Sequence, residues 1–146
     1  MNPTKILGLD LGSVTCGLAI SDGLGMFAHP LSTLRHADDL HALKDPLAEI
    51  ITKERVGEIA LGYPKMMNND VGLRAQISEE FKALLEEWFD VEVILIDERL
   101  TTAAATKQLI SADVSRKKRK QVVDQLAAVH ILQSYLDRKR FLKGND

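Results

Sequence analysis

Cysteine is almost absent from this chain of 146 residues, which holds only Cys16. A single cysteine excludes an internal disulfide framework and favours a reducing compartment. Long apolar runs are missing too, since none approaches the roughly 18 residues of a membrane-spanning helix. Residues 1–5 contain no apolar core of a signal peptide. We therefore expect a cytoplasmic protein with no membrane partner.

The chain also lacks internal repeats, low-complexity tracts and any stretch typical of an interdomain linker. Hydrophobic residues make up 45% of it, which is enough to form a core of ordinary size. One compact domain over residues 1–146 is the expectation. The four histidines show no spacing typical of a metal site, and we expect His130 to pack within its helix or stay partly exposed.

Charge is distributed unevenly along the chain. Residues 1–106 hold 9 Lys or Arg against 17 Asp or Glu, whereas residues 107–146 hold 10 against 4. The basic excess is concentrated in residues 116–120 and 138–140. Such clusters contact nucleic acid or anionic surfaces, and the alternative is a solvated loop followed by a charged helix end.

Apolar runs predict five strands. Two of them, Lys5–Leu11 and Thr15–Ser21, flank a glycine-containing turn at residues 12–14 and so predict a hairpin. A third run covers residues 26–34, where Pro30 suits an edge strand or a bulge. Shorter runs at residues 58–62 and 91–96 complete the set.

Helices are expected between and after the later strands. The Asp45-Pro46 pair predicts a cap and first turn for a helix that ends near residue 54. Residues 68–70 offer caps for a helix to about residue 89, whose apolar face repeats with helical spacing. Further helices are expected over residues 101–111 and 120–141. A hairpin followed by strands with crossover helices predicts a mixed sheet of the α/β class.

Three acidic positions stand out against this framework. Asp10 lies late in an apolar strand, where a carboxylate is destabilising unless something compensates it. Asp97 and Glu98 directly follow another buried run. Asp124 precedes the pair Ala127-Ala128, which would let its helix approach the sheet closely. Three converging carboxylates repel one another unless a divalent cation lies among them, and oxygen ligands suit Mg²⁺ or Mn²⁺.

Each carboxylate also has a purely structural explanation. Asp10 would accept hydrogen bonds from the amides of the following turn, and Asp97 would cap the loop after its strand. Asp124 would be an ordinary acidic residue in the first turn of a helix. Their joint placement favours the metal site over these separate explanations.

Four segments together resemble the motifs of the YqgF/RuvX family, the pre-16S rRNA nucleases also called Holliday junction resolvase-like proteins. In the order of the family's motifs, they are residues 6–12 (ILGLDLG), 61–68 (LGYPKMMN), 97–102 (DERLTT) and 124–132 (DQLAAVHIL). The resemblance covers nearly the whole chain. Tyr63 stands where the family often has Leu, and Asn69-Asp70 where it often has Gly-Thr or Gly-Ser, which affects loop shape and substrate contacts.

This resemblance implies an RNase H-like fold, in which a mixed five-stranded sheet is flanked by helices, with a divalent-metal nuclease site. By the same resemblance, Asp10, Glu98 and Asp124 would be the catalytic and metal-binding residues, with Mg²⁺ or Mn²⁺ as cofactor. Asp97 would point away, because neighbours on an extended chain alternate faces. The implied reaction is phosphodiester hydrolysis at the 5′ end of precursor 16S rRNA during ribosome biogenesis.

Structured RNA is the implied partner, and basic side chains are its expected contacts. Lys65 and Arg99 would bind phosphates from loops at the end of the sheet, with Arg74 as a weaker candidate. The basic run would contact the substrate backbone through Arg116, Lys117, Lys118, Arg119 and Lys120. The alternative in each case is a solvated surface charge.

Three other functions are compatible with parts of this pattern. A Holliday-junction-type DNA resolvase would use the same carboxylates, so the sequence does not separate it from an RNA nuclease. ATPases of the sugar-kinase, actin or heat-shock type also begin with Asp-x-Gly, but they need two such lobes and a longer chain. A nucleic-acid-binding module without catalysis would not require all three carboxylates.

Overall fold

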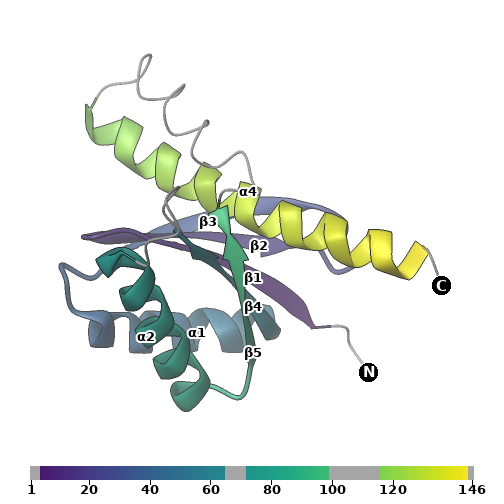
Figure 1. Ribbon diagram of the computed structural model, residues 1–146, viewed down its shortest axis with the longest axis horizontal. Coiled ribbons are helices and arrows are strands. Elements are labelled where there is room, and N and C mark those ends of the chain that lie inside the picture. The colour runs from purple at the N-terminus through teal and green to yellow at the C-terminus, as the bar shows by residue number, and fades with distance from the viewer. Residues whose placement is uncertain (1–3, 65–71, 99–115, 145–146) are drawn as a thin grey trace.

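The computed structural model describes residues 4–64, 72–98 and 116–144, without the side chains of residues 116–124 and 142–144. Within these ranges a five-stranded sheet carries helices on both faces (Figure 1). The expected mixed α/β sheet is therefore confirmed. The elements are β1 (Lys5–Leu11), β2 (Thr15–Ser21), β3 (Ala28–Arg35), η1 (Leu40–Leu43), α1 (Lys44–Glu54), β4 (Val56–Tyr63), α2 (Leu73–Trp88), β5 (Glu92–Asp97) and α4 (Arg116–Gly144).

The strand order is β3-β2-β1-β4-β5, which puts β1 at the centre. β1, β2 and β3 are antiparallel neighbours, whereas β4 and β5 run parallel to β1. The carboxyl ends of β1, β4 and β5 therefore meet at one edge of the sheet. Pro30 lies in the edge strand β3, beside a register shift between Leu18 and Ala19, as its missing N–H predicts.

The two faces of the sheet pack against different helices. Leu7 and Leu9 of β1 join a large apolar cluster with α1 and α2, whereas Ile6 joins a second cluster with α4. The alternation follows from the period of two along a strand. In Figure 1, α1 and α2 lie on one side of the sheet and α4 crosses the other.

Packing confirms the expected apolar face of α2, because Phe81 and Leu85 are fully buried. The start of α1 differs from expectation. The helix begins at Lys44 behind η1, and its N-cap is Leu43 without a side-chain bond, so Asp45 is not the cap. Asp39 caps η1 instead by accepting from the His41 amide (3.1 Å). η1 has already started the helical turn, which leaves no extended residue at Asp45 to act as a cap.

The beginnings of the later helices also differ from expectation. The N-cap of α2 is Gly72, without a side-chain bond, and the caps expected at residues 68–70 lie outside the described residues, as does the helix expected at 101–111. The last helix begins at Arg116, so residues 116–120 form helix and not a loop. Lys and Arg are good helix formers and extend a helix whose later turns are anchored on the sheet.

Close contact anchors α4 on the sheet. A Cβ added at Gly8 would lie 2.7 Å from Cβ of Leu132 and 3.0 Å from the carbonyl oxygen of Ala128, so only glycine lets the helix come this near. Gln133 accepts from the Ala28 amide (2.8 Å), and Lys139 pairs with Glu58 (2.9 Å). None of the helices described here is both long and apolar enough to span a membrane.

Candidate functional site

Asp10 lies on the face of the sheet that α4 covers. Ile6 packs with that helix and Gly8 lies directly under it, and strand alternation puts Asp10 on the same side. The Asp10 residue is only 5% exposed. It is also the next-to-last residue of β1, at the edge where the parallel strands end. Strand ends of this kind are where α/β sheets bind their ligands.

Glycines flank Asp10 on both neighbouring strands. Gly17 is its partner on β2, and Gly62 follows Leu61, the partner of Leu9, on β4. Neither glycine places a side chain beside the carboxylate. The sheet next to Asp10 therefore has room for groups that come from other elements.

Glu98 occupies part of that room. It follows β5 directly, and its Oε1 lies 3.2 Å from where a Cβ on Gly62 would be. Ile96 packs with α4, and alternation puts Glu98 on that same face and Asp97 on the opposite one. Asp10 and Glu98 thus share one face of the sheet, at the carboxyl ends of their strands.

The backbone of α4 brings Asp124 to the same level of the sheet. Its neighbour Gln125 donates from Nε2 to Oγ1 of Thr33 (3.1 Å). Thr33 pairs with Gly17, and Gly17 pairs with Asp10. Gln125 is therefore anchored to the same cross-strand row that contains Asp10. The side chain of Asp124 itself lies outside the described residues.

The oxygen donors suit a hard divalent cation. Asp10 and Glu98 supply only carboxylate oxygens, and the missing side chain of Gly62 leaves space for Glu98 to reach toward β1. Among the side chains that the structure describes, no three His, Cys, Asp or Glu residues form a group able to hold a metal ion. A third ligand would have to come from elsewhere, and Asp124 is the expected one.

His36 fastens the turn that follows Asp10. Its buried ring places Nε2 2.8 Å from the carbonyl oxygen of Gly12, and its Nδ1 accepts from the Asp38 amide (3.2 Å). Because Nδ1 accepts, Nε2 is the ring nitrogen that donates, to the carbonyl oxygen of Gly12. The His36 amide also donates to the carbonyl oxygen of Val14 (2.8 Å). These bonds hold the β1–β2 turn against the chain that follows β3.

The expected phosphate contacts are only partly described. Lys65 and Arg99 lie outside the described residues, and residues 116–120 are described as backbone only. Arg74 is exposed at the edge of the sheet near Asp10, where its guanidinium donates to the carbonyl oxygen of Leu11 (3.5 Å). Asp22 lies at the opposite end of the hairpin, where it accepts from the Met26 amide (2.8 Å), far from the carboxylates in the register of the sheet.

Sequence reasoning missed the glycines and the glutamine of this site. Gly17 and Gly62 interrupt apolar strands, which is a signal for close approach of another group. Gln125 gave no such signal, because its partner Thr33 is 92 residues away.

Comparison with known protein families identifies the family to which this chain belongs. A sequence profile of the RuvX family, described as Holliday junction resolvase, matches residues 4–138. The chain belongs to the RuvX family. A Staphylococcus aureus (strain JH9) protein provisionally named a pre-16S rRNA nuclease is 52% identical over 135 residues, which cover 91% of this chain and 95% of that protein. Proteins of the same name from strains JH1 and N315 match equally well.

Solved structures show the same fold. Thermus thermophilus RuvC, determined with a Holliday junction substrate, matches with a TM-score of 0.57 at 14% identity and covers 93% of this chain and 96% of that chain. The fowlpox virus Holliday junction resolvase matches with a TM-score of 0.52 at 17% identity, over 92% and 99%. The expected RNase H-like fold and the resemblance to RuvX are therefore confirmed.

Proposed function

We propose that this protein is a divalent-metal-dependent nuclease that hydrolyses phosphodiester bonds at the 5′ end of precursor 16S rRNA. The observation that carries the proposal is the shared position of Asp10 and Glu98, on one face at the carboxyl ends of β1 and β5. Family membership supports it, as do relatives at 52% identity named for this activity. The single buried cysteine, Cys16, suits the reducing cytoplasm in which we place the protein.

Asp10, Glu98 and Asp124 are the proposed ligands of Mg²⁺ or Mn²⁺. When bound, such an ion lowers the pKa of an attacking water and stabilises the leaving oxygen. The protein's own contribution is to hold two carboxylates at the ends of β1 and β5, on either side of β4, and the third on a docked helix. Gly17 and Gly62 place no side chain beside Asp10, and at Gly62 this lets Glu98 come close to the sheet.

The first five residues of α4 are the proposed contact for the substrate backbone. They are all Lys or Arg, and they begin the same helix whose Gln125 is anchored over the row of Asp10.

Replacing residues 116–120 by Gln should weaken RNA binding and reduce its salt dependence, by about 0.7 in the log–log slope for each phosphate that the protein no longer neutralises. Filter binding at several salt concentrations measures this slope, and an unchanged slope would reject the proposed contact. Lys65 and Arg99 remain predicted contacts.

Cleavage assays with purified protein test the metal site. The substrates are a precursor 16S rRNA fragment and a four-way DNA junction, each with Mg²⁺ or Mn²⁺. Asp10→Asn and Glu98→Gln should each lower the cleavage rate by more than about a hundredfold, because even outer-sphere partners of metal ligands contribute that much. Asp90→Asn is the matched control, since Asp90 is an exposed residue before β5 and away from the site. Equal cleavage by wild type and Asp10→Asn would contradict the assignment.

The same cleavage assay distinguishes an RNA substrate from a DNA junction. The family description names Holliday junction resolvase, so a DNA junction is the second candidate. Faster cleavage of the junction than of the RNA would overturn the RNA assignment and leave the nuclease. Binding without cleavage under either metal would instead indicate a non-catalytic nucleic-acid-binding module.

A further inference from the structure

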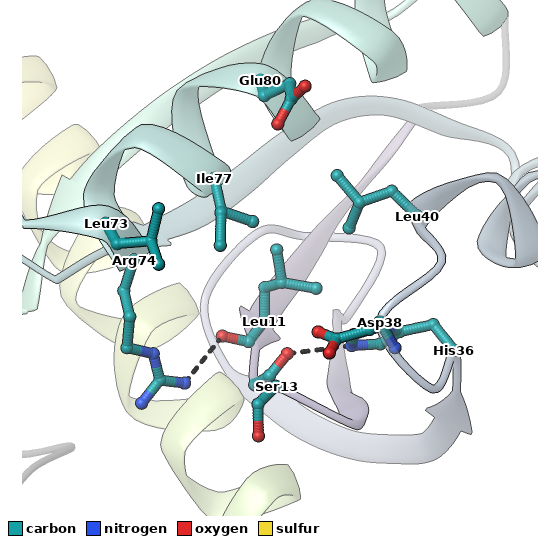
Figure 2. A pocket seen from close by; sticks show the side chains of 10 residues that line it. Leu11, Ser13, His36, Asp38, Leu40, Leu73, Arg74, Ile77 and Glu80 are labelled. Carbon is teal, nitrogen blue, oxygen red and sulfur yellow. Dashed lines mark hydrogen bonds between the residues drawn. The ribbon is translucent and has the colours of Figure 1, made fainter.

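A cavity of about 350 Å³ opens beside the β1–β2 turn, on the face opposite the carboxylates. The turn forms one wall through Gly12 and Ser13 (Figure 2). The chain between β3 and η1 forms the second wall, and the first two turns of α2 form the third. The proposed metal site does not account for this cavity, although the cavity begins one residue after Asp10.

The lining combines apolar surfaces with a few polar groups. Leu11, Leu40 and Ile77 supply apolar side chains, and Figure 2 shows the carboxylates of Asp38 and Glu80 on opposite sides of the space. Such a combination is typical of small-molecule sites, and the volume lies near the lower limit of about 300–1,000 Å³ for them. The cavity therefore suits one planar heterocycle with hydrogen-bonding edges.

The charges of the lining residues limit which class of ligand the cavity can hold. Asp38 and Glu80 contribute two carboxylates to the lining against one guanidinium, that of Arg74, which donates to Leu11. The buried ring of His36 is engaged with Gly12 and Asp38. Ionised carboxylates only accept hydrogen bonds, so the lining repels phosphate and favours a ligand rich in N–H donors.

Two residues in one wall of the cavity have strained backbone conformations. Ala37 and Asp38 both have left-handed backbones, with φ of 50° and 70°. Such a conformation is unusual for alanine and persists only where the surroundings hold it. Here the amide of Ala37 donates to Val14 (3.1 Å), and the amide of Asp38 donates to His36 (3.2 Å). Strained residues of this kind cluster at ligand sites, and this pair presents the Asp38 carboxylate to the cavity.

We propose that this cavity accepts an unpaired guanine base of the substrate strand, next to the bond that is cut. Guanine presents two neighbouring donors, N1–H and the 2-amino group, which a single carboxylate accepts together, and its faces pack against apolar side chains. Asp10 and exposed Ser13 are three residues apart, a span of at most about 11 Å of chain. A strand held at the carboxylates can therefore reach around the tip of the turn to the cavity on the other face, and proteins read unstacked RNA bases in such pockets. This inference rests on the proposed function for its substrate.

Nucleoside binding tests the pocket without any cleavage. Guanosine, inosine, adenosine and cytidine are titrated into the full chain, and the amide NMR shifts of Ser13 and Ile77 are followed. Guanosine should bind at least about tenfold more tightly than inosine, which lacks the 2-amino group. The double variant Asp38→Asn/Glu80→Gln and the pocket-filling Ile77→Trp should each remove this preference, whereas Glu87→Gln, exposed on the same helix as Glu80, should preserve it. Equal binding of all four nucleosides, or none, would overturn the proposal.

Oligonucleotides distinguish a base in a strand from a free nucleotide. Short single-stranded RNAs with one guanine or one inosine are bound to the cleavage-impaired Asp10→Asn variant, with guanosine monophosphate as the competitor. The guanine strand should bind about tenfold more tightly than the inosine strand, and Ile77→Trp in this background should equalise them. Free nucleotide that binds more tightly than the strand would overturn the assignment to substrate.

The two proposals fail in different ways. If cleavage is absent but guanosine still binds through the carboxylates of the cavity, the nuclease proposal fails and the guanine pocket stands. If cleavage depends on Asp10 but neither guanosine nor the guanine strand is preferred, only the guanine pocket is wrong.

Discussion

The two faces of the sheet belong to the same strands but carry different kinds of residue. The face toward α1 and α2 is lined by large residues such as Leu7 and Leu9, which are fully buried. The face toward α4 is lined by Gly8, Gly17 and Gly62, with the carboxylate of Asp10 between the last two. The first face is filled by large side chains of the strands themselves, whereas on the second the glycines let α4 and Glu98 come close to the sheet.

This difference teaches how a central strand holds a buried carboxylate without losing its core. Alternation lets Leu9 add to the apolar cluster while its neighbour Asp10 faces the other way. The larger apolar cluster is therefore on one face, and the proposed metal site is on the other, beside a smaller cluster. Substitutions on the face toward α1 and α2 should therefore change stability alone, whereas substitutions on the face toward α4 should change metal binding as well.

The largest expected effect comes from the filled face. Phe81→Ala should lower the free energy of unfolding by about 3–5 kcal/mol, because the ring is fully buried among α2, β4 and β5 neighbours. Urea titration followed by circular dichroism measures this decrease. Cleavage per folded molecule should stay unchanged. Glu87→Ala, exposed on the same helix, is the control, and equal stability of the two variants would contradict the division between faces.

The face toward α4 should respond to an added methyl group. Gly8→Ala should lower the free energy of unfolding by about 1–3 kcal/mol and weaken Mn²⁺ binding, because α4 must move away from β1. Unfolding curves and calorimetric titration of Mn²⁺ measure the two effects. Gly23→Ala is the matched control, since a Cβ there meets nothing within 4 Å. A variant at Gly8 with unchanged metal affinity would show that the docking of α4 does not set the site.

A smaller effect is expected at high pH where α4 meets β4. Burial raises the pKa of Tyr135, and its hydrogen bond to the Glu58 carboxylate raises the pKa further. The folded state therefore holds the phenol proton more tightly than the unfolded chain, whose tyrosine pKa is about 10. This contribution is complete below pH 10 and is lost as the pH rises.

Tyr135→Phe tests that contribution. The variant should be about 1 kcal/mol less stable at neutral pH and should lose less stability than wild type between about pH 9 and 11. Thermal unfolding over this pH range is the measurement. Lys139 also pairs with Glu58, so the carboxylate keeps one partner in the variant. Parallel pH profiles for wild type and variant would show that Tyr135 does not contribute.

The smallest effect is a gain in stability at the end of α1, on the filled face. Arg55 has a left-handed backbone, with φ of 55°, directly after the helix. Arg55→Gly should stabilise the fold by roughly 0.5 kcal/mol, because glycine adopts this conformation without strain. Lys53→Gly, within the last turn, should instead destabilise it by about 1 kcal/mol. Urea midpoints that fall equally in both would refute the argument from backbone conformation.

Local patterns predicted most of the framework. Apolar runs located all five strands to within two residues at every end, and Pro30 indicated the edge. The errors are at helix starts, at Asp45 and at residues 116–120, where a preceding turn or a distant anchor overrode the local signal. Of the site, the apolar context of Asp10 and the strand-end position of Glu98 were readable, whereas the glycines beside them were not recognised.

The amino-acid sequence by itself determined which residues alternate, where the strands run and which carboxylates follow apolar segments, because these depend on neighbours along the chain. It also carried the family, because 52% identity extends over 135 residues. Only the tertiary structure decided that Gly62 makes room for Glu98 and that Gln125 anchors α4 over the row of Asp10. Gly62 and Glu98 are separated by 36 positions in the chain, and Thr33 and Gln125 are separated by 92. Only the pairing of β5 within the sheet and the packing of α4 on it bring these residues together.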